Sequence, residues 1–206
     1  MRGKTTIKAA RPLVLASMSR YRRALLERLG YPFEVAPADL DETALKGEAP
    51  AATALRLAEA KARAVAARYA DALVIGSDQV ADADGVAISK PEHHGAAVAQ
   101  LQLLSGRTIV FHTAIALVDA ASGRCSARLV DVRSTFRALS PLTIEAYLRR
   151  EQPYDCAGAV KSESLGIALF ERIESDDPTA LIGLPLIALT GLLRDEGIDV
   201  LIPPRE

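Results

Sequence analysis

The sequence has almost no net charge, few cysteines and no long hydrophobic run. Its 25 Lys and Arg residues nearly balance 26 Asp and Glu residues, for a net charge of -1. This balance excludes a strongly basic surface of the kind that binds nucleic-acid backbone. Residues 181–193 form one of the longest apolar stretches, but Gly183, Pro185 and Gly191 interrupt it and it is too short to span a bilayer. We therefore expect small, nearly neutral molecules as partners, and neither nucleic acid nor a membrane.

The cysteines and the first residues favour a cytoplasmic protein. Cys125 and Cys156 are far apart and lack metal-type spacing. Residues 1–11 are basic but have no apolar centre of the kind that a secretory signal peptide needs. We therefore expect reduced thiols, a flexible basic tail over residues 1–11 and one domain over residues 12–206.

The pattern of apolar residues predicts an α/β domain. Half of the 206 residues are hydrophobic, so the chain can bury a sizeable core as one domain, with or without two lobes. Strands are expected at 12–17, 33–36, 71–76, 108–119, 125–139 and 168–173. Helices are expected at about 18–30, 51–69, 96–104, 141–151 and 177–196. Early strands alternate with helices, whereas the two longest strands are joined by a short turn and should pair antiparallel. This combination predicts a mixed β-sheet flanked by helices.

The start of the first expected helix is basic. Arg20, Arg22 and Arg23 crowd a helix N-terminus, where the helix dipole normally favours acidic residues. A bound anion would balance this charge. The arginines, the hydroxyls of Ser17 and Ser19 and the free backbone N–H groups together form a candidate phosphate-binding turn. The alternative is that the arginines are solvated and Ser19 is an ordinary N-cap.

Asp78 comes at the expected end of an apolar strand. The run 71–76 closes on Gly76, and Ser77, Asp78 and Gln79 follow. A carboxylate at the end of a buried strand is costly unless a charged group meets it there. We therefore expect a charged partner for Asp78.

A second acidic group, Asp39, Asp41 and Glu42, lies in a loop after the strand expected at 33–36. Such oxygen ligands suit Mg²⁺ or Mn²⁺. Two alternatives stay open: a solvated loop, and the D-x-D-x-T pattern of haloacid-dehalogenase-type phosphatases over residues 39–43, with Asp39 as phosphoryl acceptor. The acidic residues of such a phosphatase would be Asp39, Asp41, Asp176 and Asp177.

Three lysines are candidates for a site. Lys61 shares a helix face with Leu57 and Val65, so its chain either passes the core to reach solvent or directs its amine into a site. Lys90 follows a hairpin that we expect around residues 81–85, and it precedes Pro91. Lys161 lies in a stretch of small residues that would let the backbone approach a ligand closely.

Several short motifs occur in a specific order between residues 13 and 201. They are LASMSRYRR, the DE of LDET, AEAKA, IGSDQV, SKP, CAGAVKSESLGIALFERI and DPTALIGLPL. In order and spacing the chain resembles the Maf family of nucleotide pyrophosphatases. Gln79 after the Asp, the K-S-E triplet and the DPTALIGLPL ending are similar to the branch that acts on N7-methyl-GTP, whereas the dTTP/UTP branch usually has Thr after this Asp.

The resemblance implies a two-lobed single domain with a central cleft, and a homodimer. The implied catalytic residues are Asp78, as the acid-base group, Lys61 and Lys90. The residues implied to set substrate choice are Tyr21, Gln79 and Glu163. The phosphate and metal site would be lined by Ser17, Arg22, Arg23, Glu42, Lys61, Lys90 and Lys161, with Mg²⁺ or Mn²⁺ on Glu42 and Asp78. Departures from the usual family residues are Arg20 in place of Pro, Ala159 in place of Ser and Ser164 in place of Gly.

The expected activity is metal-assisted hydrolysis of N7-methyl-GTP to the monophosphate and pyrophosphate. Water would attack the α-phosphorus while Asp78 takes its proton. Two alternatives stay open: the phosphatase described above, and a nucleotide-binding regulator of septum formation without turnover. The nearly complete set of acidic and basic residues favours the enzyme over the regulator.

Overall fold

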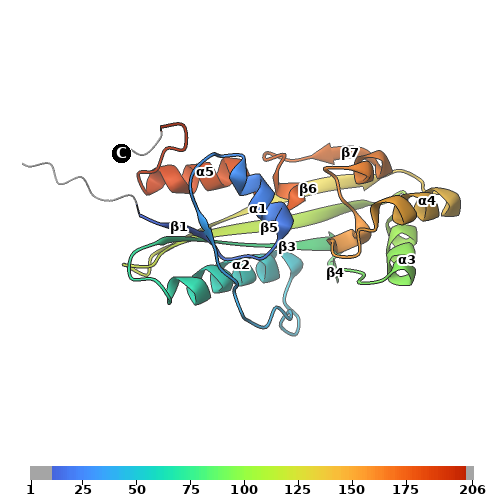
Figure 1. The fold of residues 1–206 in the computed structure, drawn as a ribbon. Helices are drawn as coiled ribbons and strands as arrows, with labels where there is room; N and C mark the ends of the chain where they lie inside the picture. The colour runs from blue at the N-terminus through green and yellow to red at the C-terminus, as the bar shows by residue number, and fades with distance from the viewer. Residues whose placement is uncertain (1–10, 203–206) are drawn as a thin grey trace, which may run out of the picture.

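A mixed β-sheet runs through the whole molecule (Figure 1). The computed structural model describes residues 11–202. The strands are β1 (Leu13–Leu15), β2 (Glu34–Val35), β3 (Leu73–Ala83), β4 (Val86–Ile88), β5 (Thr108–Asp119), β6 (Cys125–Phe136) and β7 (Phe170–Glu174). Their order is β2-β1-β3-β5-β6-β7, with β4 paired to β3. Because β1 is parallel to both of its neighbours and all other pairs are antiparallel, the expected mixed α/β class is confirmed.

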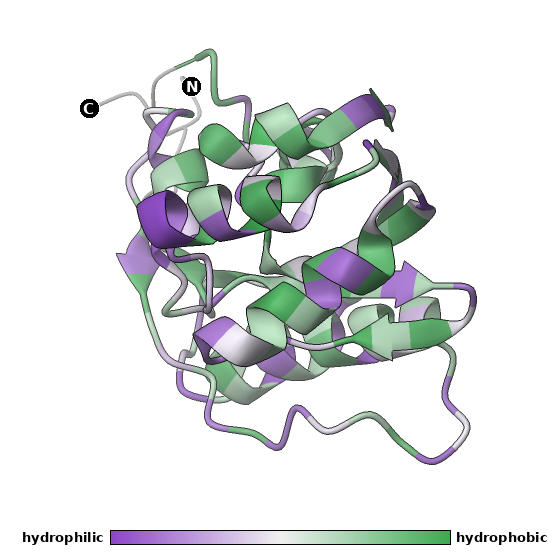
Figure 2. Ribbon diagram, turned by 90° about the vertical axis from the view of Figure 1, so that its right-hand side faces the viewer, coloured by the Kyte–Doolittle hydropathy of each residue, from purple (hydrophilic) through white to green (hydrophobic). Residues whose placement is uncertain are grey.

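Helices cover both faces of the sheet and one of its ends. They are α1 (Arg20–Glu27), α2 (Pro50–Ala66), α3 (His94–Leu104), α4 (Pro141–Glu151) and α5 (Leu186–Asp195). Helix α2 lies on one face, α1 and α5 lie on the other, and α3 and α4 lie together at one end (Figure 1). Residues of β1 alternate between these layers, since Leu13 and Leu15 pack with α1 and α5 while Val14 packs with α2. Hydrophobic residues, green in Figure 2, are spread over the helices of both layers.

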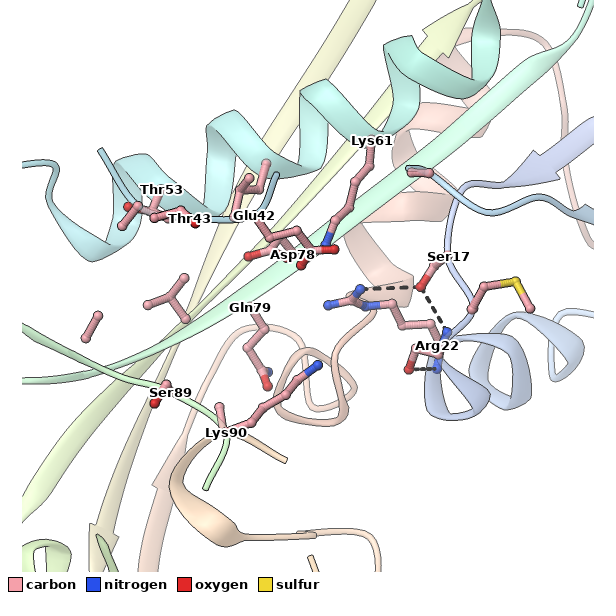
Figure 3. A pocket seen from close by; sticks show the side chains of 18 of the residues that line it. Ser17, Arg22, Glu42, Thr43, Thr53, Lys61, Asp78, Gln79, Ser89 and Lys90 are labelled. Carbon is pink, nitrogen blue, oxygen red and sulfur yellow. Dashed lines mark hydrogen bonds and ion pairs between the residues drawn. The ribbon is translucent and has the colours of Figure 1, made fainter. Parts of the chain in front are cut away.

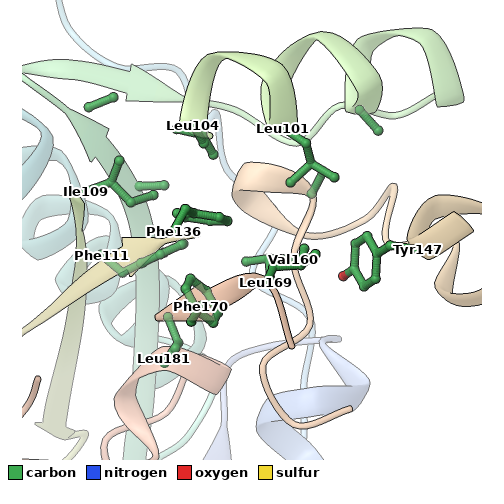
Figure 4. Packing of buried hydrophobic residues seen from close by; sticks show 14 of the residues in the cluster. Leu101, Leu104, Ile109, Phe111, Phe136, Tyr147, Val160, Leu169, Phe170 and Leu181 are labelled. Atoms are coloured by element: carbon green, nitrogen blue, oxygen red, sulfur yellow. The ribbon is translucent and has the colours of Figure 1, made fainter. Parts of the chain in front are cut away.

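A separate apolar cluster fills the end that carries α3 and α4 (Figure 4). Leu101 and Leu104 of α3 pack there with Phe111 of β5. Phe136 and Phe170 join β6 to β7, with ring centroids 4.6 Å apart. The chain therefore forms two lobes on one shared sheet: this cluster fills one, and a cluster on each face of the sheet fills the other.

Gly76 allows α2 to lie unusually close to the sheet. A Cβ atom built at Gly76 would lie 2.1 Å from the carbonyl oxygen of Ala58 and 2.9 Å from the Cβ of Ala62. The facing residues of α2 are largely alanines, which bury little volume between helix and sheet. This close approach brings Lys61, on the same helix next to Ala62, over β3.

The strand that contains Asp78 is longer than the sequence suggests. The prediction that it ends at Gly76 is wrong, because β5 pairs with β3 from Leu73 to Asp82 and keeps it extended. On the other side of β3, β1 pairs with it only as far as Ile75, and the pairing with β4 starts only at Ala81. Residues 76–80 therefore have one edge that no strand covers, and Asp78 lies in the middle of that gap.

The closing helix expected over 177–196 is confirmed at its end, but its expected start is wrong. A short 3-10 turn at Ala180–Ile182 is followed by Gly183, whose φ of 115° no helix allows, and α5 begins only after Pro185. Buried Asp177 accepts hydrogen bonds from the backbone N–H groups of Ile187 and Ala188 at 2.7 and 3.2 Å. It thus caps α5 from outside the helix.

Within residues 11–202 no helix is both long and apolar enough to cross a membrane. The expected flexible tail lies outside the described residues except for Arg11, whose guanidinium pairs with Asp71 and Asp119. Cys125 and Cys156 are both free thiols.

Candidate active site

A large cavity opens at the uncovered edge of β3 (Figure 3). It lies between the turn that joins β1 to α1 and the end of the β3–β4 hairpin, and its volume is about 1030 Å³. Its polar lining residues are Ser17, Ser19, Arg22, Glu42, Thr43, Thr53, Lys61, Asp78, Gln79, Ser89, Lys90 and Glu92. The gap between β1 and β4 therefore gathers most of the residues that the sequence singles out.

Lys61 and Asp78 form a buried ion pair on the floor of this cavity. The Lys61 ammonium donates a hydrogen bond to Oδ1 of Asp78 at 2.7 Å, and it lies 2.8 Å from Oε2 of Glu42. Lys61 and Asp78 are only 5% and 6% exposed, whereas the Glu42 side chain is 53% exposed. Lys61 is thus a charged protein partner of Asp78, and its amine points into the site rather than to solvent.

The start of α1 supplies positive charge to the same cavity. Ser19 caps the helix by accepting from the backbone N–H of Arg22. Nε of Arg22 donates to the carbonyl oxygen of Gly183 at 2.9 Å, and Nη1 lies 3.4 Å from Oγ of Ser17. Burial lowers the pKa of Arg22, while the charges of Asp78 and Glu42 partly oppose that shift. These bonds hold the guanidinium toward Asp78 (Figure 3).

Lys90 and Gln79 lie at the boundary between this cavity and a smaller one. Lys90 is exposed and, among the described residues, has no ion-pair partner. Nε2 of Gln79 donates to Oγ1 of Thr113 and to the carbonyl oxygens of Ala180 and Leu181, at 2.9 to 3.0 Å. The protein thereby fixes the Gln79 amide, and only its oxygen is available to a ligand.

The smaller cavity, of about 100 Å³, opens beside Tyr21 and Glu163. Glu163 is exposed, while Tyr21 is held by its neighbours. The Tyr21 hydroxyl accepts from Nη2 of Arg20 at 2.7 Å and lies 3.2 Å from Oδ2 of Asp155. The Arg20 guanidinium lies 4.8 Å from the centre of the Tyr21 ring. The Arg20 guanidinium therefore already covers one face of the Tyr21 ring, so a ligand can stack only on the opposite face.

Cys156 also lines the smaller cavity. Burial raises the pKa of its thiol to about 12. The thiol is therefore protonated at neutral pH and is no nucleophile.

Two of the expected site residues do not reach either cavity. Arg23 lines neither, because adjacent residues of a helix point about 100° apart, and its Nε pairs with Glu27 one turn later at 2.9 Å. Lys161 donates to the carbonyl oxygen of Glu151 at 3.0 Å and lies 3.7 Å from its carboxylate. The structure thus places neither Arg23 nor Lys161 in the lining of these two cavities. Lys161 instead ties its loop to the end of α4.

The residues of the alternative phosphatase are scattered. Asp39 is exposed and lines neither cavity. Asp41 accepts from the backbone N–H of Thr43 at 2.9 Å in a local turn, and Asp177 caps α5. No three acidic side chains cluster in the described part of the chain, so the structure contradicts the D-x-D-x-T interpretation.

The loop that carries Glu42 is fastened to α2 by Arg56. Nε and Nη2 of Arg56 each donate to the Glu48 carboxylate at 2.7 Å, and Nη2 also donates to the carbonyl oxygen of Thr43. Hydrogen bonds from Arg56, Leu45 and Thr53 lower the pKa of Glu48 to about 2. In Figure 2 this loop runs along the bottom and carries several hydrophilic stretches. Its shape therefore depends on this anchor rather than on a core of its own.

Comparison with known proteins gives the family of this chain. The family model described as Maf-like protein matches residues 12–196. The chain belongs to the Maf family. It is 60% identical over 185 residues to the 7-methyl-GTP pyrophosphatase of Cupriavidus metallidurans, which covers 90% of this chain and 93% of that protein. Proteins of the same name from Thiobacillus denitrificans and Albidiferax ferrireducens are 57% and 54% identical, and each match covers 93% of this chain and 96% of the relative.

In this Maf family chain, the donor set on the cavity floor fits a divalent cation. Oxygens of Asp78 and Glu42 already converge on one positive group, the Lys61 ammonium. Mg²⁺ usually takes one or two carboxylates and completes its shell with water and substrate phosphates. Within residues 11–202 no three His, Cys, Asp or Glu side chains cluster for a metal, so the protein alone offers only this pair.

Some contacts around the two cavities carry no signal in the sequence. Thr113 lies opposite Gln79 in the β3–β5 register, a pairing hidden by the prediction that β3 ends at Gly76. Arg56 and Glu48 are 8 residues apart across the start of α2, and no local pattern joins them. Asp155 lies 134 residues from Tyr21, so only the fold shows their contact.

Proposed function

We propose that this protein hydrolyses N7-methyl-GTP to N7-methyl-GMP and pyrophosphate. One observation carries the proposal: a buried Lys61–Asp78 pair faces the basic start of α1 across a single cavity. The names of relatives that are 54–60% identical to this chain support the substrate.

The triphosphate would occupy the large cavity. Arg22, Ser17 and the free N–H groups at the start of α1 lie on one side of it, and Lys90 lies on another (Figure 3). Charged donors bind phosphate oxygens strongly, and a helix N-terminus adds a favourable dipole. These groups would hold the leaving pyrophosphate and stabilise the charge that builds up on it.

Asp78 would act as the general base. Its Oδ1 is held by Lys61, whereas Oδ2 accepts no hydrogen bond from the described residues. Water bound at Oδ2 would pass a proton to that oxygen as its own oxygen bonds to the α-phosphorus. The bond from the α-phosphorus to its bridging oxygen breaks, and pyrophosphate leaves with the electron pair.

Glu42 and Asp78 would hold Mg²⁺ or Mn²⁺ together with phosphate oxygens of the substrate. When bound, the cation supplies neutralising charge at the reacting phosphates. Lys61 orients both carboxylates, since its ammonium contacts each of them within 2.8 Å.

The base would enter the smaller cavity. Glu163 offers a carboxylate that can accept from N1–H and the N2 amine of guanine together. The fixed amide oxygen of Gln79 offers another acceptor, and the ring of Tyr21 forms a wall. These roles for Tyr21, Gln79 and Glu163 are part of the proposal.

The experiment incubates the purified chain with N7-methyl-GTP, GTP and UTP and either Mg²⁺ or Mn²⁺, and resolves the products. N7-methyl-GMP with pyrophosphate, formed faster than product from GTP or UTP, is the expected result. Orthophosphate with the diphosphate would overturn the proposal in favour of a phosphatase, and binding without turnover would favour the regulator.

We also expect a homodimer, from the family resemblance. Light scattering on the purified protein measures this, and a mass twice that of the chain would support it. A mass equal to that of one chain at all concentrations tested would contradict it.

A further inference from the structure

The two cavities differ in the charges that line them. The large cavity is lined by the cations Lys61, Arg22 and Lys90 and by the carboxylates Glu42, Asp78 and Glu92, and it shares Arg22 and Lys90 with the smaller cavity. The smaller cavity has two carboxylates that do not line the large one, Asp155 and Glu163. Charges of both signs therefore line each cavity, but only the smaller one brings Asp155 and Glu163 to the place proposed for the base.

Asp155 has not been given a role above, and its existing contacts are weak. Its two oxygens lie 3.2 and 3.3 Å from the Tyr21 hydroxyl, 3.2 Å from Nη2 of Arg20 and 3.5 Å from Sγ of Cys156. The side chains of Arg20 and Asp155 are 70% and 50% exposed, so water competes for this pair.

The Asp155 carboxylate is ionised at neutral pH. Burial works to raise its pKa, but hydrogen bonds from Cys156 and Tyr21 outweigh burial and leave the pKa below the usual value. Asp155 therefore brings a full negative charge to the rim of a cavity that is sized for part of a ligand.

We infer that Asp155 is a specificity-determining residue, which favours the positively charged N7-methylguanine ring over the neutral guanine ring. The inference rests on the proposed function, because it assigns the base to the smaller cavity. Both bases present the same N1–H and N2 donors to Glu163, so these hydrogen bonds alone do not separate them, and the Glu163 charge acts on the ring together with that of Asp155. They differ in the methyl group and in the charge of the ring, and a carboxylate a few ångströms away attracts only the charged ring.

A competing explanation is that Asp155 only holds Tyr21 in place. Arg20 separates the two explanations, because it contacts Tyr21 and Asp155 and carries the opposite charge. Loss of Arg20 would weaken the hold on Tyr21 but would make the rim of the cavity more negative.

The experiment measures kcat/KM for N7-methyl-GTP and for GTP at mildly acidic pH, where N1 keeps its proton and the methylated ring its charge. Asp155→Asn keeps the shape of the side chain, and we expect it to lower the ratio of the two values about fivefold. Added salt should lower the wild-type ratio but have little effect on the variant's ratio. Asp131→Asn is the matched control, since Asp131 lies on β6 beside His112, lines neither cavity and should leave the ratio unchanged.

Arg20→Gln should keep or raise the ratio. An unchanged ratio in Asp155→Asn would overturn the inference, and so would an equal fall in both variants, which would assign Asp155 to the support of Tyr21. Asp155→Glu keeps the charge and should retain most of the preference for N7-methyl-GTP over GTP. If this preference fell as much as in Asp155→Asn, the charge of Asp155 would not be its cause, and the inference would be overturned.

A binding measurement separates this inference from the proposed function. Calorimetry with N7-methylguanosine and guanosine, on the same variants, should show the same change in preference without any hydrolysis. If the wild type released no pyrophosphate, the proposed function would fail. The preference for the charged nucleoside, and its loss in Asp155→Asn, would still test Asp155.

Discussion

The floor of the large cavity, formed by Lys61 and Asp78, and the rim of the smaller cavity, formed by Arg20 and Asp155, both consist of charged side chains. These two pairs are held in different ways. On the floor, Lys61 and Asp78 are almost fully buried and 2.7 Å apart, on a helix and a strand that pack through alanines and a glycine. At the rim, Arg20 and Asp155 are at least half exposed and 3.2 Å apart, on a helix start and a loop.

This difference follows the tasks proposed for each region. Proton transfer requires an acceptor in a fixed position, and a buried pair between two regular elements provides one. Base recognition requires side chains from which a ligand can displace water, and exposed side chains at the rim meet this requirement. Substitutions on the floor should therefore act on turnover and stability, and substitutions at the rim on preference.

The largest effect is expected for Asp78→Asn. The amide keeps the shape of the side chain but cannot take a proton, so kcat should fall about 10²–10⁴-fold while nucleotide binding remains. Steady-state kinetics and calorimetry measure the two. Asp39→Asn is the control and should behave like the wild type. If Asp78→Asn kept half of the wild-type turnover, Asp78 would be excluded as the general base.

Arg22→Ala should come next. Loss of a charged donor to phosphate is expected to weaken binding of the triphosphate about 10- to 100-fold and binding of the nucleoside much less. Arg23→Ala, on the next residue of the same helix, should change either affinity little because Arg23 faces Glu27. Equal losses in the two variants would contradict the different roles that the structure assigns to these neighbours.

Gly76→Ala tests whether the floor depends on close packing. The added methyl group meets backbone of α2 at 2.1 Å, so we expect a loss of about 1–3 kcal/mol in the free energy of unfolding. Turnover should also fall as Lys61 moves away from Asp78. Gly191→Ala, on the exposed side of α5 with nothing within 4 Å, should instead stabilise the protein by about 0.5–1 kcal/mol. Denaturant unfolding measures both, and similar changes of the same sign would refute the packing argument.

The smallest effect is expected for Arg56→Ala. Release of the loop should displace Glu42 and raise the metal concentration needed for half-maximal activity several-fold, because Glu42 is a proposed ligand. Backbone amide exchange over residues 41–48 should become faster. Arg63→Ala on the same helix removes only an exposed bond to the carbonyl oxygen of Gly123 and serves as the control. If Arg56→Ala changed the base preference and left the metal requirement unchanged, Arg56 would not be the residue that positions Glu42 for the metal.

Local signals predicted most of the elements and the basic part of the site. The arginines after Ser19 break the usual charge pattern of a helix start, and the structure places Arg22 in the large cavity. Helical periodicity could not separate Arg22 from Arg23, because which of two adjacent side chains faces a cavity depends on how the helix packs. The polar stretch around Lys161 pointed to a binding loop, but the lysine itself serves the end of α4.

The sequence alone determined the family, the mixed α/β class and the presence of a costly carboxylate at Asp78, because each is written in local order, periodicity or residue type. Only the tertiary structure decided that the partner of Asp78 is Lys61, that β3 continues past Gly76 and that Asp155 meets Tyr21. The reason is physical: contacts between residues far apart in the chain depend on helix packing and strand register, and no short stretch of sequence encodes either of these by itself.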